Sequence, residues 1–365
     1  MDYSKRLNMI EMFQEPPEYK PPGTVEQLAA TLNYPNMNSQ QYRMTRKLPA
    51  NVLHPCLECV VMNDQGLILV AGNDFMGRRW GSSLYGWDNI NNVMDDSKAS
   101  FKRQNRHIVT TLKFTRDSNL FVLGNDKGAV ELWSTQNPAR GKGFSLYLVD
   151  SQSEHIEGVS SMDLLESEEY KLVTGSNDGC LKVWIYGADL QSISTMAMAH
   201  IDEITGISSN AENGSLFATS SLDRSCLLWD LRKPRPASAI FDEHKFGFST
   251  VYWTSAKEAN EIICLGDEAG NLHFVDIRQP GIFLDSVKVF DRKIHKISFN
   301  AKNMAVLGNT NQVKFYDEKL QLMHECIPSK SYLRDVLWDK NYTSRSGSGA
   351  CWLAGWESFF QRVEY

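Results

Sequence analysis

"KLVTGSNDGCLKVW", residues 171–184, is the stretch of this sequence that decides the fold. An apolar run leads into a turn of Ser, Asn, Asp and Gly, and a second apolar run ends at Trp184. Two apolar runs joined by a short polar turn are typical of an antiparallel β-hairpin. The same pattern recurs in "LFVLGNDKGAVELW" ending at Trp133, "LFATSSLDRSCLLWD" ending at Asp230, "EIICLGDEAGNLHFVD" ending at Asp276 and "MAVLGNTNQVKFYD" ending at Asp317.

These hairpins recur at a regular interval. Corresponding residues follow one another every 41 to 51 residues, at Trp87, Trp133, Trp184, Trp229, Val275 and Tyr316. Strand-rich repeats of this length are the signature of a β-propeller. A first copy ends at Trp87, and a weaker last copy, "CWLAGWESFFQRVEY", ends the chain. The sequence therefore predicts an all-β fold, a seven-bladed propeller.

The repeats resemble those of the WD-repeat family, whose blades end in Trp-Asp. Trp229-Asp230 is the literal dipeptide, and Val275-Asp276 and Tyr316-Asp317 are degenerate forms of it. A histidine also precedes several repeats, at His107, His155 and His200. The resemblance implies that the histidine, an aspartate of the turn and the terminal tryptophan form a buried hydrogen-bond network. The expected members are His155, Asp178 and Trp184 in one blade and His200, Asp223 and Trp229 in the next.

Recurrence of the His/Asp pairs favours a packing role over catalysis, because an active site occurs once. "GNDKGA", residues 124–129, joins two predicted strands and so lacks the helix N-terminus that binds phosphate. The sequence has no GxSxG, HExxH or P-loop motif. "CLEC", residues 56–59, is the only CxxC and has no second ligand pair at zinc spacing. We expect no catalytic residue, no cofactor and no metal.

Residues 1–37 differ from the rest of the chain. "EPPEYKPPG", residues 15–23, is proline-rich and therefore extended, and "TVEQLAATL", residues 24–32, is predicted to form a short helix. We expect a mostly flexible N-terminal arm over 1–37 and the WD-repeat propeller over 38–365. "QQYRMTRKL", residues 40–48, is predicted to close the ring as the outer strand of the last blade.

The overall composition argues against some classes of partner and indicates the cellular compartment. The net charge of −6 argues against direct nucleic-acid binding, which needs a basic face. No run of 18 apolar residues is present, and the start lacks the apolar core of a signal peptide, so we expect no membrane contact. Seven scattered cysteines indicate buried free thiols in a reducing compartment. These features predict a protein of the cytoplasm, found also in the nucleus.

The first repeat carries extra residues. Gly72 to Trp87 spans 15 residues, whereas Gly124 to Trp133 spans nine. The additional residues, around "DFMGRRW", are predicted to project from the ring as a loop. Trp80 has no blade position to fill there, and it either folds back onto its own blade or contacts a partner. Exposed Trp is uncommon, and Trp and Arg dominate interface hot spots, which favours a partner.

Several segments together resemble the methylosome protein 50 family, the WD-repeat partners of the type II protein arginine methyltransferase, with the insect form, Valois, as the expected nearest member. They are "GRRWGSSLY", "GAVELW", "LLWDLRKPRPAS", "GDEAGNLHFVD" and "YLRDVLWDKN" followed by "GWES". The resemblance implies a non-catalytic subunit in a ring of four heterodimers, which helps to present Sm proteins and histones for symmetric arginine dimethylation. Docking through "GRxW" would place Arg78 and Trp80 on the methyltransferase, with Arg79 solvated.

A second interpretation starts from "WDLR", residues 229–232, the short motif by which some WD-repeat proteins join cullin-based ubiquitin ligases as substrate receptors. The blade already requires Trp229 and Asp230, so only Arg232 adds information. A ligase receptor that uses Arg232 therefore stands as the alternative to a methyltransferase partner.

Overall fold

The computed structural model describes residues 53–75, 80–136, 146–166, 170–233, 238–254, 261–300, 303–317, 320–339 and 349–365. The predicted arm over 1–37, its helix, the closing strand over 40–48 and Arg78 lie outside the described residues. Two short 3₁₀ helices are the only helices in the described ranges, η1 (Ile90–Asn92) and η2 (Asp96–Lys98). Neither has the length and hydrophobicity that crossing a bilayer demands.

Seven antiparallel sheets account for nearly all the described chain, and the predicted seven-bladed propeller is confirmed. The first sheet contains β1 (Cys56–Met62), β2 (Ile68–Asp74), β3 (Gly81–Trp87) and β4 (Phe101–Asn105); the second contains β5 (Val109–Phe114), β6 (Leu120–Asn125), β7 (Ala129–Ser134) and β8 (Tyr147–Ser153). The third contains β9 (Val159–Glu166), β10 (Tyr170–Ser176), β11 (Leu181–Tyr186) and β12 (Leu190–Met196); the fourth contains β13 (Ile204–Ser209), β14 (Leu216–Ser221), β15 (Cys226–Asp230) and β16 (Ser238–Phe241).

The last three sheets follow the same order along the chain. The fifth contains β17 (Phe248–Trp253), β18 (Ile262–Asp267), β19 (Asn271–Asp276) and β20 (Asp285–Lys288); the sixth contains β21 (Ile294–Asn300), β22 (Asn303–Gly308), β23 (Val313–Tyr316) and β24 (Leu322–Cys326). The seventh contains β25 (Leu333–Trp338), β26 (Ala350–Gly355) and β27 (Phe359–Glu364), three strands among the described residues. Each sheet is one blade.

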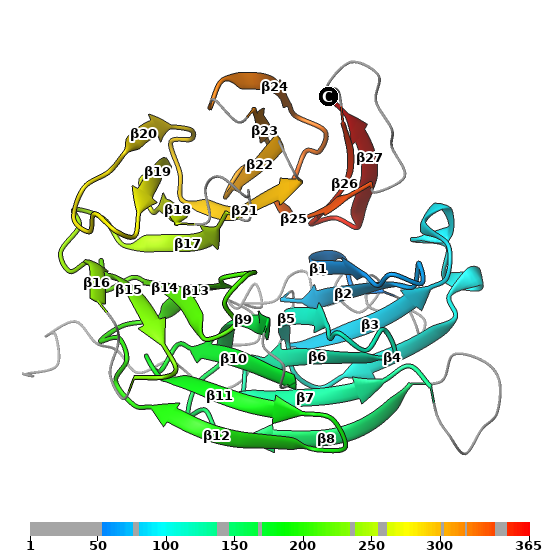
Figure 1. The fold of residues 1–365 in the computed structure, drawn as a ribbon. Helices are drawn as coiled ribbons and strands as arrows, with labels where there is room; N and C mark the ends of the chain where they lie inside the picture. The colour runs from blue at the N-terminus through cyan, green and yellow to red at the C-terminus, as the bar shows by residue number, and fades with distance from the viewer. Residues whose placement is uncertain are drawn as a thin grey trace, which may run out of the picture. The chain divides into compact units, whose positions relative to one another are not determined.

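The blades follow one another in a ring, from blue β1 to red β27 in Figure 1. The first strand of each blade contacts the first strand of the next, and β25 contacts β1 to close the ring. The contact between the last and first blades includes a 2.9 Å hydrogen bond from the Val60 N–H to Asp335 and one of 2.7 Å from the Ser358 N–H to the Pro55 carbonyl. Ring closure therefore does not depend on apolar packing alone.

The core lies between neighbouring blades. Middle strands such as β2 are buried along almost their whole length, because a blade is covered on both faces, whereas the outer strand β4 is largely exposed. Between the first and second blades, Leu69 and Leu84 pack with Phe121 and Trp133 in one cluster. The repeat tryptophans Trp87, Trp133 and Trp184 are almost completely buried, which explains why a large apolar residue recurs at this position.

Candidate partner-binding site

The hairpin of β2 and β3 extends beyond its counterparts. Counted from the pair that holds the repeat tryptophan, its ladder runs from Ile68 with Trp87 to Asp74 with Gly81. That is three pairs further than the ladder of β10 and β11, which runs from Leu172 with Trp184 to Gly175 with Leu181. The extra residues of the first repeat thus lengthen the ladder as well as the turn. Residues 75–80 connect the two strands, and Phe75 and Trp80 are the described residues of this connection.

Trp80 is 58% exposed, the only exposed tryptophan among the described residues. Its ring meets the ring of Phe75 edge-on, with centroids 6.0 Å apart and an interplanar angle of 83°. Trp80 thus rests against one neighbour of its own hairpin and leaves most of its surface to solvent. Of the residues expected to bind the methyltransferase, the structure describes Trp80 alone, because Arg78 lies outside the described residues.

Two aromatic side chains of the seventh blade continue the row. The Phe75 ring lies 6.0 Å from that of Trp356, and the Trp356 ring lies 5.2 Å from that of Tyr332. We call Phe75, Trp80, Tyr332 and Trp356 the aromatic cluster. Its members come from both ends of the described chain and meet where the first and last blades join.

Glu58 of β1 holds the cluster in place. One of its carboxylate oxygens accepts a 2.9 Å hydrogen bond from the Trp356 indole N–H, and the other accepts a 2.8 Å hydrogen bond from Arg334. The Trp356 backbone N–H also donates to the Tyr332 carbonyl at 2.9 Å. Phe75, Trp80 and Trp356 line one part of a cavity of about 1050 Å³ that is bordered by the first strands of the blades. Trp80 therefore stands on a fixed base at the rim of the central cavity.

Sequence reasoning selected Trp80 and missed its supports. Tyr332 and Arg334 lie in "YLRDVLWDKN" and Trp356 in "GWES", two of the segments that carried the family resemblance, but nothing in their spacing indicated that they meet the first blade. Phe75 was visible only as part of the extra residues. These supports join strands of the first and last blades, so only the ring closure brings them together.

The predicted blade network is built around a threonine that sequence reasoning did not name. In the fourth blade the Thr219 hydroxyl accepts a 2.9 Å hydrogen bond from the Trp229 indole and lies 2.7 Å from His200 Nε2. The other ring nitrogen, His200 Nδ1, lies 3.0 Å from the Asp223 carboxylate. Burial would raise the pKa of Asp223, but hydrogen bonds from His200 and Ser225 outweigh burial and hold it well below the ordinary value.

The third blade repeats this arrangement with one looser link. The Thr174 hydroxyl lies 2.8 Å from both His155 Nε2 and Trp184 Nε1. His155 Nδ1, however, lies 3.7 Å from Asp178, too far for a hydrogen bond. Burial lowers the pKa of His155 to about 4, so its ring is neutral near pH 7. In both blades the network threonine lies ten residues before the terminal tryptophan, and this shared spacing could have identified it from the sequence.

His107 does not share the position of His155 and His200. Val109 pairs with Asn125 as Val159 pairs with Ser176, so the counterpart of His155 in the second blade is Asn105. His107 is exposed, and its carbonyl accepts a hydrogen bond from Ser82. The expectation that His107 occupies the histidine position of the repeat was wrong. Asn105 holds that position, and His107 lies two residues further along the chain.

Arg232, the residue of the alternative interpretation, clasps the Asp230 of its own motif. Its Nε and Nη2 donate to the two Asp230 oxygens at 2.8 Å each, while 62% of the Arg232 side chain stays exposed. In the next blade Arg278 pairs with Asp276 in the same way, through Nε at 2.9 Å. The Asp-x-Arg pair is therefore a repeated feature of neighbouring blades.

Comparison with known proteins agrees with this architecture. The family model described as "WD domain, G-beta repeat" matches residues 147–184 and 191–230. Each match covers the outer strand of one blade and the first three strands of the next, β8 to β11 and β12 to β15. The chain is thus a WD-repeat β-propeller.

The proteins to which the chain is similar indicate which group of WD-repeat proteins it resembles. It is 29% identical to Protein valois of Drosophila melanogaster over 91% of this chain and 94% of that protein. It is 28% identical to Methylosome protein WDR77 of Xenopus laevis over 75% of this chain and 80% of that protein. The chain belongs to the family of WD-repeat proteins that includes Valois and WDR77. A DDB1- and CUL4-associated factor 7 homolog of Dictyostelium discoideum is 23% identical over 62% of this chain and 69% of that protein.

Proposed function

We propose that this chain is a non-catalytic WD-repeat subunit of a methylosome, which binds the type II protein arginine methyltransferase through the aromatic cluster. The similarity to a methylosome protein supports the assembly. The observation that carries the binding site is Trp80, which is 58% exposed on a base fixed by Glu58 and Trp356. A large, rigid aromatic side chain loses little conformational entropy when a partner pocket takes it up.

Within this proposal the methyltransferase supplies the chemistry, and the propeller positions basic substrates such as Sm proteins and histones. The net charge of −6 suits arginine-rich partners. Four heterodimers form the proposed assembly, and light scattering of the purified complex would measure its mass. The seven cysteines are all free, which fits the reducing cytoplasm or nucleus, and imaging of the tagged chain would test that location.

The direct test is affinity purification of the methyltransferase with the wild-type chain and with Trp80→Ala. The loss of an interface tryptophan costs about 2 kcal/mol or more, so we expect capture to weaken by about 30-fold or more. Tyr170→Ala is the matched control, because Tyr170 is 53% exposed on the third blade, away from the cluster. Both variants should melt like the wild type. Equal capture by Trp80→Ala and wild type would remove the cluster from the interface.

The second candidate is a substrate receptor of a cullin-based ubiquitin ligase. The exposed guanidinium of Arg232 favours it, and its pairing with Asp230, repeated at Arg278 and Asp276, favours a structural role instead. Binding of a ligase adaptor that is lost in Arg232→Ala, with methyltransferase capture absent, would select this candidate over the first.

A further inference from the structure

The fifth blade departs from the pattern of the third and fourth. His244 opens it as His200 opens the fourth, since each donates its backbone N–H to the turn of the preceding blade, at 3.0 Å. The strand pairing Ile263 with Val275 matches that of Phe217 with Trp229. In this alignment three members of the His200 network, Thr219, Asp223 and Trp229, are replaced by Leu265, Ala269 and Val275. His244 has therefore lost the network of its counterparts.

The same alignment places two new groups beside His244. Asp267 of β18 stands where the fourth blade has Ser221, and His273 of β19 stands where it has Leu227. Asp267 is completely buried and His273 is 5% exposed. A buried carboxylate and imidazole need partners, so their joint appearance here requires an explanation.

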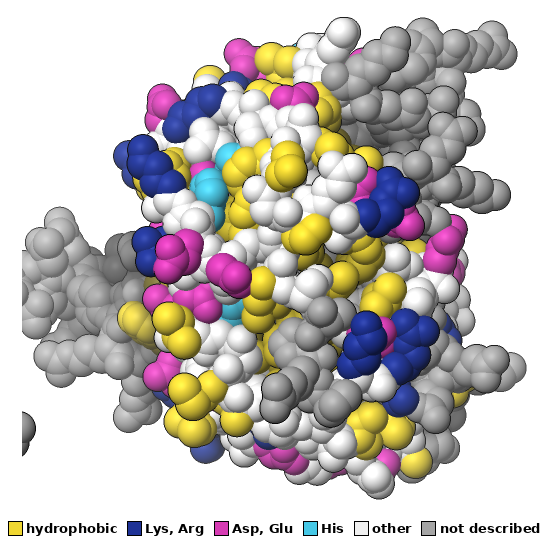
Figure 2. All heavy atoms as spheres, turned by 60° about the vertical axis from the view of Figure 1, so that its left-hand side comes forward, with side chains coloured by type: hydrophobic (Ala, Val, Ile, Leu, Met, Phe, Trp, Pro, Cys, Tyr) yellow, Lys and Arg dark blue, Asp and Glu magenta, His cyan; other side chains and the backbone are white. Residues whose placement is uncertain are grey.

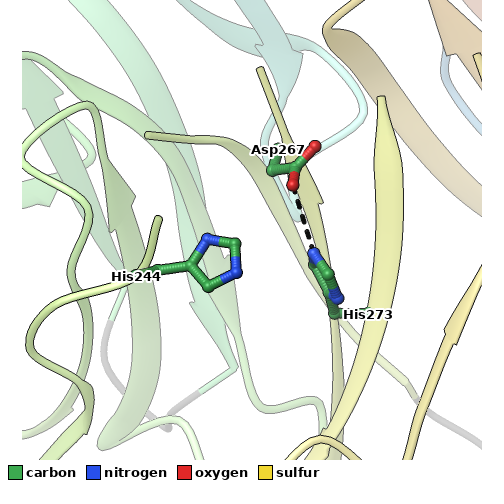
Figure 3. A group of neighbouring side chains, drawn as sticks. All are labelled: His244, Asp267 and His273. Carbon is green, nitrogen blue, oxygen red and sulfur yellow. Dashed lines mark hydrogen bonds and ion pairs between the residues drawn. The ribbon is translucent and has the colours of Figure 1, made fainter. Parts of the chain in front are cut away.

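Figure 3 shows the three side chains facing one another. His273 Nε2 lies 3.3 Å from an Asp267 oxygen, and His273 Nδ1 lies 2.7 Å from the Ser286 hydroxyl. The Asn271 backbone and side-chain N–H groups each donate to Asp267 at 2.7 Å. The Asp267 and His273 side chains are thus held by neighbours other than His244.

His244 completes the group from the loop that precedes β17. Its Nδ1 lies 3.1 Å from the Phe246 carbonyl and 3.4 Å from the Phe246 N–H. The tautomer that carries its proton on Nδ1 donates to the carbonyl and leaves a lone pair on Nε2. The ligand atoms of the three residues all lie within 4.8 Å of one another, and no other such His, Cys, Asp or Glu group exists among the described residues. His244 is only partly buried, and exposed Asp242 and Glu243 precede it, so a cation can approach from solvent.

Aromatic side chains pack against the two histidines of this group. The ring of Phe248 stacks on His244 at 4.8 Å, and that of Phe283 stacks on His273 at 4.2 Å. Figure 2 shows imidazole surface (cyan) among hydrophobic side chains (yellow) on the side of the molecule that it brings forward.

We propose that His244, Asp267 and His273 form a zinc site, with a water molecule as fourth ligand. Two imidazoles and one carboxylate are a donor set that Zn²⁺ prefers. Zinc bonds of about 2.0 Å in a tetrahedron separate neighbouring ligand atoms by about 3.3 Å, and the His273–Asp267 separation is 3.3 Å. His244 must approach from the 4.8 Å span, a movement that its partly exposed loop permits.

The surroundings supply the outer contacts that zinc sites use. The Ser286 hydroxyl can accept a hydrogen bond from His273 Nδ1, and the Phe246 carbonyl can accept one from His244 Nδ1. In these tautomers both Nε2 atoms are left to the metal. Bound zinc would tie the loop before β17 to β18 and β19. It would replace the hydrogen-bond network that performs this task in the fourth blade. Sequence reasoning expected no metal, because these ligands lie 23 and six residues apart and form no known motif.

The test is a titration of the metal-free full-length chain with Zn²⁺ by calorimetry. We expect one equivalent to bind, with affinity reduced at least about tenfold in His244→Ala. His107→Ala is the control, because it removes an exposed histidine from the corresponding turn of another blade and should leave affinity unchanged. No saturable binding by the wild type, or equal binding by His244→Ala, would overturn the proposal.

Two further measurements guard against misfolding and against binding by thiols. Zn²⁺ should raise the melting temperature of the wild type and of His107→Ala but not that of Asp267→Asn, whose side chain keeps its shape. Co²⁺ in place of Zn²⁺ should give tetrahedral absorption bands without thiolate charge-transfer bands. Thiolate bands would assign the metal to cysteines such as Cys56 and refute the site. The outcome does not depend on methyltransferase binding, which is measured separately with Trp80→Ala.

Discussion

The Trp229 indole donates a 2.9 Å hydrogen bond to the Thr219 hydroxyl, which makes this threonine the link between the last strand of the repeat and His200. Thr219→Val keeps the shape of the side chain and removes both contacts. Because the indole N–H and His200 Nε2 then stay buried without partners, we predict a loss of about 1–3 kcal/mol in the free energy of unfolding. Urea denaturation of the purified chain measures it.

Thr195→Val is the control for this substitution. Thr195 is exposed on β12, where its hydroxyl accepts a hydrogen bond from Lys182. Surface substitutions usually change stability by less than about 0.5 kcal/mol. If Thr219→Val and Thr195→Val unfold at the same urea concentration, the hydroxyl of Thr219 does not link the network.

A pH dependence of stability follows from His155. Burial lowers the pKa of His155 to about 4, whereas an unfolded histidine titrates near its ordinary value of 6.5. As the pH falls below 6.5, the unfolded chain binds a proton that the folded chain does not, so stability is present above 6.5 and is lost toward pH 4. Between pH 7 and pH 5 we predict a loss of about 2 kcal/mol from this residue.

His155→Gln isolates this contribution from those of the acidic residues. The variant is less stable at pH 7, but its stability should fall by about 2 kcal/mol less than that of the wild type between pH 7 and pH 5. Urea unfolding of both proteins at the two pH values gives the difference. Parallel pH profiles would mean that His155 carries a proton in the folded state.

Phe75 offers a finer test of the aromatic cluster than Trp80. Its ring lies 6.0 Å from those of both Trp80 and Trp356, so it supports Trp80 without sharing its exposure. We predict that Phe75→Ala weakens methyltransferase capture by about tenfold, less than Trp80→Ala, because the indole loses its support but remains. A titration with the purified enzyme measures both affinities. An effect of Phe75→Ala larger than that of Trp80→Ala would make Phe75 the anchor.

The fold was predictable from sequence because the repeat states the same structure several times. Each apolar hairpin with its terminal aromatic, as in residues 171–184, must bury both faces, and only neighbouring copies can cover them. The position of Trp80 was predictable for a related reason, since it is a large aromatic in residues that the repeat leaves over. Such residues stand out against the copies that lack them.

Contacts between the first and seventh blades, which are neighbours in the ring but far apart in the sequence, could not be predicted in this way. Glu58 meets Arg334 and Trp356 only because the ring closes, and no local pattern encodes that closure. Asp267 and His273 were hidden for another reason. They lie within an ordinary hairpin, and their meaning emerges only when strand register aligns them with Ser221 and Leu227 of the fourth blade.

Arg232 and Arg278 offer a test that distinguishes the two candidate partners, the methyltransferase and a ubiquitin-ligase adaptor. Each guanidinium clasps the aspartate two residues before it, and each side chain is more than 60% exposed. Because exposed ion pairs contribute little to stability, the double variant Arg232→Ala/Arg278→Ala should melt within a degree or so of the wild type. It should also capture the methyltransferase fully, because these residues belong to the fourth and fifth blades and the aromatic cluster to the first and seventh. The measurement is a pull-down of the methyltransferase, and separately of a ligase adaptor, by the wild type, the double variant and Trp80→Ala. Loss of methyltransferase capture in a folded double variant would move the interface away from Trp80.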